Sequence, residues 1–114
     1  MRGNEYQKLI AGILGTKQIA FNPDLAKALG SINAGLFLSQ LLYWWEKGKI
    51  ANWIYKTAKE FQEETGLSKK EQLRAQKICV KKGLIEVKLA QIPAKRHFKI
   101  NIDKITELLR DSIQ

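Results

Sequence analysis

The residues best suited to chemistry lie in one basic stretch, TGLSKKEQLRAQKICVKKGLIEV, at positions 65–87. Six lysines or arginines lie between Ser68 and Lys82, at spacings that place most of them on one side of a helix. Ammonium and guanidinium groups arranged in this way bind phosphates and the edges of bases. The stretch therefore predicts a surface for a polyanion, and the alternative is an ordinary solvated helix face.

The charge of the whole chain also indicates an acidic partner. The 114 residues include 20 Lys and Arg against 11 Asp and Glu, a formal net charge of +9 with a pI near 9.8. Residues 66–102 hold ten of the basic residues and only two acidic ones, so this segment carries +8. Such a concentration of positive charge favours nucleic acid as the partner.

Other kinds of site find little support. Cys79 and His97 are the only cysteine and histidine, which excludes an internal disulfide and leaves too few ligands for a typical metal site. Cys79 is expected to be a buried apolar residue. Glu60, Glu63 and Glu64 lack the arrangement of an acid/base pair, and no phosphate loop or nucleophile motif is present. We predict no enzymatic activity, no cofactor, no membrane span and a cytoplasmic location.

Capping patterns define the elements around the basic stretch. Thr57 with Glu60, and Ser68 with Glu71, each match the pattern that opens a helix, so a helix-turn-helix is predicted at about 57–82. Gly83 is expected to end its second helix. Alternating apolar residues then predict a β-hairpin at about 84–102, turned by AQIPA. A helix-turn-helix followed by a hairpin is the order of a winged helix.

Further helices are predicted on both sides of this unit. EYQKLIAGILG has helical spacing, Asn22 is placed to cap a second helix, and Ser31 a third. The third segment, INAGLFLSQLLYWWEKG, is apolar on more than one face and is expected either at the centre of the core or in a subunit contact, with Gly48 as its C-cap. An amphipathic helix is expected at about 103–113, capped by Asp103, with one face buried on the domain or on another copy.

The predicted fold class is therefore mainly α with a small β-hairpin (α+β), a winged helix-turn-helix with extra N- and C-terminal helices. One domain, residues 1–114, accounts for the length.

At this level the chain resembles a known group. GLSKKEQLRAQKICVKKGLIE and IPAKRHFKIN, preceded by FNPDLAKALGSINAGLFLSQLLYWW and WIYKTAKEF, resemble the N-terminal winged helix-turn-helix domains of phage and prophage replication proteins, the replisome-organiser and DnaD-like group. The resemblance spans about residues 18–105 and implies DNA binding in phage-type replication initiation or organisation. Those proteins also carry helicase-loading domains, which these 114 residues are not expected to contain. A winged-helix transcriptional regulator is therefore the alternative.

A helical wheel separates the two sides of the predicted recognition helix. Ala75, Ile78 and Cys79 form the inward stripe, and the outward residues are expected to meet the major groove. Lysines and arginines there suit bases or phosphates, Gln76 suits a base, and Leu73 suits a thymine methyl group. Val80 lies too late on the helix for a base and suits a rim or dimer contact.

The hairpin is expected to add contacts to the DNA backbone or minor groove through Lys95 and Arg96. Ordinary edge-strand charges are the alternative there. The full set of predicted DNA-binding residues is Lys69, Lys70, Leu73, Arg74, Gln76, Lys77, Lys95 and Arg96.

Aromatic residues offer another possible contact. Trp44, Trp45 and Trp53 could stack on single-stranded bases, but the end of an apolar helix makes core packing the better interpretation of the first two.

The expected partners are double-stranded DNA, a second copy in a homodimer or higher oligomer, and replication proteins. A protein-interaction or oligomerisation module without DNA binding is the remaining alternative, in which Leu73, Val80 and the C-terminal helix would contact another chain.

Overall fold

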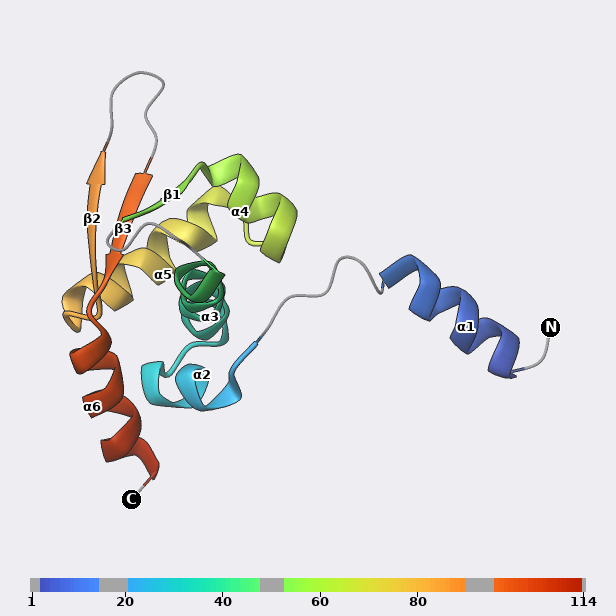
Figure 1. The fold of residues 1–114 in the computed structure, drawn as a ribbon, viewed down its shortest axis with the longest axis horizontal. Helices are drawn as coiled ribbons and strands as arrows, with labels where there is room; N and C mark the ends of the chain where they lie inside the picture. The colour runs from blue at the N-terminus through green and yellow to red at the C-terminus, as the bar shows by residue number, and fades with distance from the viewer. Residues whose placement is uncertain (1–2, 15–20, 48–52, 90–95, 114) are drawn as a thin grey trace.

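The structure, a computed structural model, describes residues 3–14, 21–47, 53–89 and 96–113. These residues form six helices and a small three-stranded antiparallel sheet, which confirms a mainly helical α+β architecture (Figure 1). In chain order the elements are α1 (Gly3–Leu14), α2 (Pro23–Leu29), α3 (Ile32–Lys47), β1 (Ile54–Lys56), α4 (Ala58–Thr65), α5 (Lys69–Lys81), β2 (Ile85–Leu89), β3 (Arg96–Ile100) and α6 (Ile102–Ile113).

Side-chain caps separate α2 from α3 as expected. Asn22 Oδ1 accepts a hydrogen bond of 3.1 Å from a backbone N–H in the first turn of α2. Gly30, at φ 68°, ends that helix in the left-handed region, where a Cβ would be strained. The hydroxyl of Ser31 then accepts from the N–H of Ala34 at 3.1 Å and opens α3. Gly48, the expected C-cap of α3, lies outside the described residues.

The start of α6 differs from the sequence-based expectation. The helix begins at Ile102, and its cap is Asn101 rather than Asp103, because the N–H of Lys104 donates to Asn101 Oδ1 at 3.2 Å. Asn101 directly follows β3, so strand and helix are joined by a single capping residue. Ile105 is buried, so the helix packs one face on the domain, which is one of the two outcomes expected for it.

The core is built around α3, which is the first of the two positions that its apolar composition allowed. Phe37, Leu38 and Leu41 are fully buried. The ring of Phe37 stacks on Phe61 of α4 at 4.8 Å and meets the edge of Phe98 of β3 at 5.7 Å. Three elements far apart in the chain are therefore held by one aromatic cluster.

A close approach between α2 and α3 requires glycine at position 35. A Cβ built there would lie 2.5 Å from the Cα and Cβ of Ala26, closer than atoms can pack. The two helices consequently touch backbone to backbone at this point.

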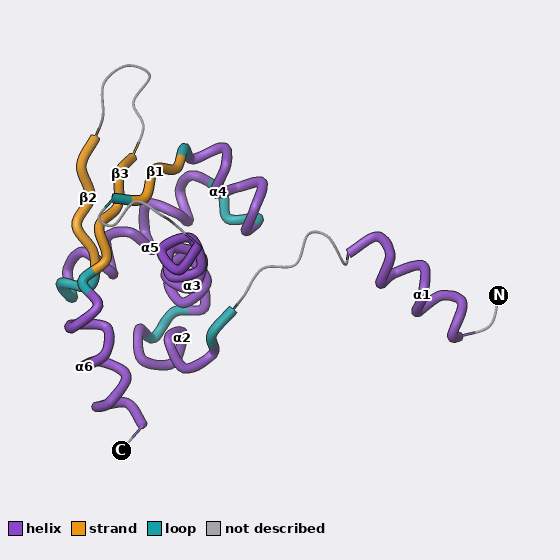
Figure 2. The backbone as a smooth tube through the Cα atoms, in the orientation of Figure 1, coloured by secondary structure: helices purple, strands orange, loops and turns teal. Residues whose placement is uncertain are grey.

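The sheet has the strand order β1-β3-β2, so the predicted hairpin gains a third strand on the far side of β3. Phe98 pairs with Ile54 on one side and with Val87 on the other. Figure 2 shows the three strands side by side at one edge of the helical part. Since neighbouring residues of a strand point to opposite faces, Phe98 faces the helices while His97 and Lys99 point outward.

Helix α1 stands apart from the other elements (Figure 1). Its apolar side chains occupy a helical stripe, yet each is between 51% and 61% exposed: Tyr6, Leu9, Ile10, Ile13 and Leu14. The stripe thus has no cover within the described chain.

Candidate nucleic-acid interface

The first turn of α5 is held by a complete capping box, as predicted. Ser68 Oγ accepts from the N–H of Glu71 at 3.2 Å, and Glu71 Oε1 accepts from the N–H of Ser68 at 2.9 Å. The other carboxylate oxygen of Glu71 accepts from Asn33 Nδ2 of α3 at 3.3 Å. These bonds lower the pKa of Glu71, chiefly through the backbone N–H of Ser68. The helix start is therefore tied both to its own turn and to the central helix.

The capping box of α5 is expected to stabilise the fold, and part of this stabilisation should depend on pH. Ser68→Ala is expected to lower the free energy of unfolding by about 1 kcal/mol. A carboxylate whose folded pKa is lowered stabilises the protein above its unfolded pKa, and this contribution is lost as the pH falls. Glu71→Gln should consequently flatten the loss of stability below pH 4.5, the ordinary pKa of this group. Urea unfolding followed by circular dichroism at several pH values measures the free energy of unfolding of both variants. If Glu71→Gln has the same dependence of stability on pH as the wild type, the prediction for Glu71 is contradicted.

The inward side of α5 contains a polar residue that the sequence analysis missed. Gln72 is fully buried beside Ala75 and Cys79. Its Nε2 donates to the carbonyl oxygens of Leu67 and Ala58, both at 2.9 Å, and so fixes the turn between α4 and α5. The helical wheel offered a signal, because Gln72 falls about 60° from Ala75 at 100° per residue.

Cys79 occupies the predicted core position. It is fully buried, and burial raises the pKa of its thiol to about 12. The thiolate is therefore absent near neutral pH, which agrees with a packing role.

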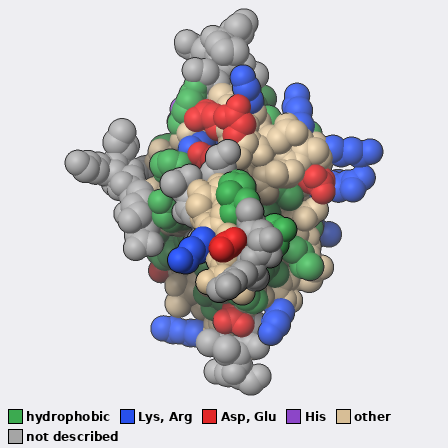
Figure 3. All heavy atoms as spheres, turned by 90° about the vertical axis from the view of Figure 1, so that its right-hand side faces the viewer, with side chains coloured by type: hydrophobic (Ala, Val, Ile, Leu, Met, Phe, Trp, Pro, Cys, Tyr) green, Lys and Arg blue, Asp and Glu red, His purple; other side chains and the backbone are tan. Residues whose placement is uncertain are grey.

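The outward side of α5 presents the predicted cations to solvent. We call this surface the basic face of α5; all of its members are exposed, and they are Lys69, Lys70, Leu73, Arg74 and Lys77. The only acid of the helix is Glu71, whose oxygens are engaged in the cap and by α3. The face therefore has no carboxylate of its own helix to neutralise it. In the space-filling view of Figure 3, lysine and arginine side chains project together from one edge of the molecule.

Arg96 was expected on the exposed wing, and the structure corrects this placement. Only 8% of the residue is exposed, and its guanidinium donates to Gln72 Oε1 and, at 2.9 Å, to Gln76 Oε1. It also lies over the rings of Phe61 and Phe98, 5.7 and 5.3 Å from their centres. The reason is strand alternation, because Arg96 has the same parity in β3 as the buried Phe98.

Burial lowers the pKa of the Arg96 guanidinium, and none of the described ion pairs involves it. Its role in this structure is to link β3 to the inner side of α5.

Gln76 is not part of the basic face of α5. Gln76 was expected to point outward to a base, but it is half-buried and its Oε1 accepts from Arg96. Lys95 lies outside the described residues, so its predicted contact stays a prediction. The basic face of α5 thus retains five of the eight predicted positions.

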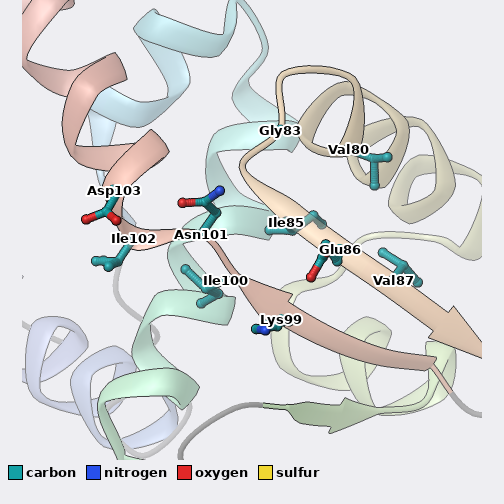
Figure 4. A pocket seen from close by; sticks show the side chains of 10 residues that line it. All are labelled: Val80, Gly83, Ile85, Glu86, Val87, Lys99, Ile100, Asn101, Ile102 and Asp103. Carbon is teal, nitrogen blue, oxygen red and sulfur yellow. The ribbon is translucent and has the colours of Figure 1, made fainter.

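A shallow hollow of about 790 Å³ lies beyond the end of α5. Figure 4 shows its lining side chains, which come from α5, both strands of the hairpin and the start of α6. Val80, predicted as a rim or dimer contact, is 44% exposed at its border, and Ile102 is 40% exposed.

A second polar cluster, which was also missed in the sequence, joins β1, α3 and α4. Lys56 of β1 is 7% exposed, and its Nζ lies 2.6 Å from Glu64 Oε1 of α4. Glu64 Oε2 accepts from Gln40 Nε2 at 3.0 Å and from Trp44 Nε1 at 3.1 Å, both on α3. The Lys56 ammonium also lies 3.5 Å from the centre of the Trp44 ring. The alternation of β1 could have shown that Lys56 faces inward, but nothing local pairs it with Glu64.

The tryptophans end in different surroundings. Trp44 is half-buried in the Glu64 cluster, whereas Trp45 is 42% exposed, so core packing was the wrong expectation for Trp45. Trp53 is half-buried beside the sheet, where Lys88 Nζ lies 4.3 Å from its ring centre.

Within the described ranges, no cluster of three or more His, Cys, Asp or Glu side chains is arranged to bind a metal ion. No described helix has both the length and the apolar content needed to cross a membrane. Comparison of the chain with protein-family models, with curated proteins and with solved structures finds no match.

Proposed function

We propose that this protein is a winged helix-turn-helix that binds double-stranded DNA, with α5 in the major groove. The order of the elements supports this, since α3, β1, α4, α5, β2 and β3 follow one another as in a winged helix, and α4 and α5 are joined by only three residues, 66–68. The antiparallel hairpin β2–β3 then takes the place of the wing.

The observation that carries the proposal is the basic face of α5. Four cations project from one helix that is anchored on its opposite side by Gln72, Ala75 and Cys79. A rigid helix with this charge fits the major groove, where lysines and arginines bind guanine edges and flanking phosphates. Leu73, 45% exposed among these cations, is an apolar side chain of the kind that contacts a thymine methyl group.

The test is a titration of fluorescently labelled duplex DNA, followed by anisotropy at several salt concentrations. Each phosphate contact is expected to contribute a slope of about −0.9 to the logarithm of affinity against the logarithm of salt concentration. Binding that does not respond to salt, or no binding at low salt, would contradict the proposal.

We assign the protein to phage-type replication initiation or organisation, on the strength of its resemblance to that group. A winged-helix transcriptional regulator is the competing role and uses the same surface. Mapping of bound sites by chromatin immunoprecipitation separates the two, because a regulator occupies promoters and a replication protein occupies a replication origin.

The exposed stripe of α1 favours a second candidate function, self-association. Apolar side chains along one side of a helix are normally covered in a soluble protein, and here each of them is at least half exposed. A second copy that offers the same stripe would cover it in a symmetric pair.

This candidate makes a direct prediction. Leu9→Asp together with Ile13→Asp is expected to convert a dimer or higher oligomer to monomer, measured by analytical ultracentrifugation. Because α1 stands apart from the core, thermal unfolding of the remaining helices should stay nearly unchanged. Lys8→Asp, on the same helix but outside the stripe, is the matched control. A wild-type protein that is already monomeric at high concentration would exclude this candidate.

A further inference from the structure

The outer face of the sheet, which points away from the helices, carries an aromatic and basic surface that the proposed function does not use. In the strand register Tyr55 lies opposite His97, and His97 lies opposite Lys88. One step along on the same face, Lys99 lies opposite Glu86 and beside Trp53. We call this surface the sheet platform; its members are Trp53, Tyr55, Lys88, His97 and Lys99.

The aromatic rings of the sheet platform are held in place by their neighbours. The rings of Tyr55 and His97 meet edge to face, with their centres 5.0 Å apart. His97 Nδ1 is buried and has no hydrogen-bond partner among the described residues. Trp53 and Tyr55 are two residues apart in an extended segment, so their Cα atoms are roughly 6.7 Å apart at the usual rise per residue. Two successive bases can stack on rings spaced in this way.

The charges beside these rings suit a phosphate backbone. Lys88 Nζ and Lys99 Nζ lie 4.3 and 6.0 Å from the centre of the Trp53 ring, and both residues are exposed. Glu86 is the one carboxylate among the described outward residues of the strands. A base that stacks on Trp53 displaces an ammonium from the ring, and the ammonium then meets a phosphate. One favourable contact of the lysine is thereby exchanged for another.

The sheet platform and the basic face of α5 point in different directions. Arg96 projects from the inner face of β3 and bonds to Gln72 and Gln76 of α5, so α5 packs against the inner side of the sheet. His97 and Lys99, its neighbours in β3, project from the opposite side. A strand bound on the sheet platform would therefore not occupy the groove-binding surface.

We propose that the sheet platform binds single-stranded DNA, with bases stacked on Trp53 and Tyr55 and phosphates paired with Lys88 and Lys99. Paired bases in a duplex cannot offer their faces to these rings, whereas an unpaired strand offers a face at every base. The sheet platform thus binds the unpaired single strand, while α5 binds the duplex.

The test measures anisotropy of a labelled thymidine oligonucleotide of about ten nucleotides, a length within the range of single-strand sites. Trp53→Ala and Tyr55→Ala are each expected to weaken binding about tenfold, and Lys88→Glu with Lys99→Glu by more. Trp45→Ala and Tyr43→Ala are matched controls, because Trp45 is also a surface tryptophan and both tyrosines are 37% exposed. Thermal unfolding checks that each variant folds, and Trp53→Phe, which keeps a ring, should restore most of the affinity.

The same variants separate this proposal from the one made for α5. Trp53→Ala and Tyr55→Ala should leave duplex binding unchanged within about twofold, and a saturating duplex should not displace the thymidine strand. No binding of the oligonucleotide, or equal losses in the platform variants and their controls, would overturn the proposal without touching duplex recognition. A uridine oligonucleotide should bind comparably or more weakly, and a clear preference for it would overturn the assignment to DNA.

Discussion

Charge reversal of Lys70 and Arg74 together is expected to weaken duplex DNA binding about 100-fold at low salt. Both residues lie in the first half of α5 and are exposed on its basic face. Each contact to a phosphate or a base edge contributes about 1–3 kcal/mol, and a factor of ten corresponds to about 1.4 kcal/mol. Two lost contacts therefore account for roughly two orders of magnitude, before the added repulsion of the new carboxylates.

The salt dependence of duplex affinity provides an independent test of the Lys70 and Arg74 variant. Loss of two phosphate contacts should make the slope of log affinity against log salt shallower by about 1.8, at about 0.9 per contact. Lys104→Glu on α6 is the matched control, because it reverses an exposed charge that is not part of the basic face of α5. Anisotropy titrations at four or more salt concentrations give both quantities. Retained binding by the Lys70 and Arg74 variant, with loss in the control, would move the interface away from α5.

Removal of the Glu64 carboxylate is expected to lower the free energy of unfolding by more than the loss of the Ser68 cap does. Glu64→Ala removes the nearer carboxylate of the nearly buried Lys56 ammonium, which keeps only the longer contact of 4.0 Å to Glu60 Oε2. It also removes the acceptor of Gln40 and Trp44. Breaking such a pair from one side costs about 3 kcal/mol, a large part of the 5–15 kcal/mol that typically stabilises a domain. The midpoint of thermal unfolding should fall by about 10 °C or more.

Two further variants identify the cause of that loss. Glu63→Ala alters the neighbouring, exposed carboxylate and should change stability by less than about 0.5 kcal/mol. Lys56→Met in a Glu64→Gln background removes the buried charge while an oxygen still accepts from Gln40 and Trp44. This double variant should be more stable than Glu64→Gln alone. If Lys56→Met instead adds to the damage, the ammonium itself stabilises the fold and the explanation fails.

Much of the fold follows from short-range patterns. Each of the hydroxyl caps accepts a hydrogen bond from the backbone N–H three residues later, so it can be recognised from the local sequence; these caps are Ser31, Thr57 and Ser68. The alternation around Phe98 and the wheel around Ala75 likewise locate the inward faces of β3 and α5. For the same reason the exposure of Lys70, Arg74 and Lys77 was predicted correctly.

The predictions that the structure contradicts involve contacts between distant parts of the chain. Gln76 was assigned to a base, and Arg96 to the DNA backbone or minor groove, because neither residue was considered against the element that it contacts. The two residues are 20 positions apart in sequence, and the fold brings them together so that the Arg96 guanidinium donates a hydrogen bond to Gln76 Oε1. Buried polar groups require partners, but which partner they find depends on how β3 lies against α5.

Local pattern alone settles which segments are helices and strands, which faces turn inward, and where positive charge collects, because each of these depends on residues within one or two turns. The tertiary arrangement decides the rest. It adds β1 to the hairpin, buries Arg96 and Lys56 against partners from other elements, leaves the stripe of α1 uncovered, and gathers Trp53, Tyr55 and His97 on one face of the sheet. Strand alternation indicates that Arg96 and Lys56 face inward, but the partners that they meet and the other outcomes depend on strand register and helix packing, which relate residues far apart in the chain.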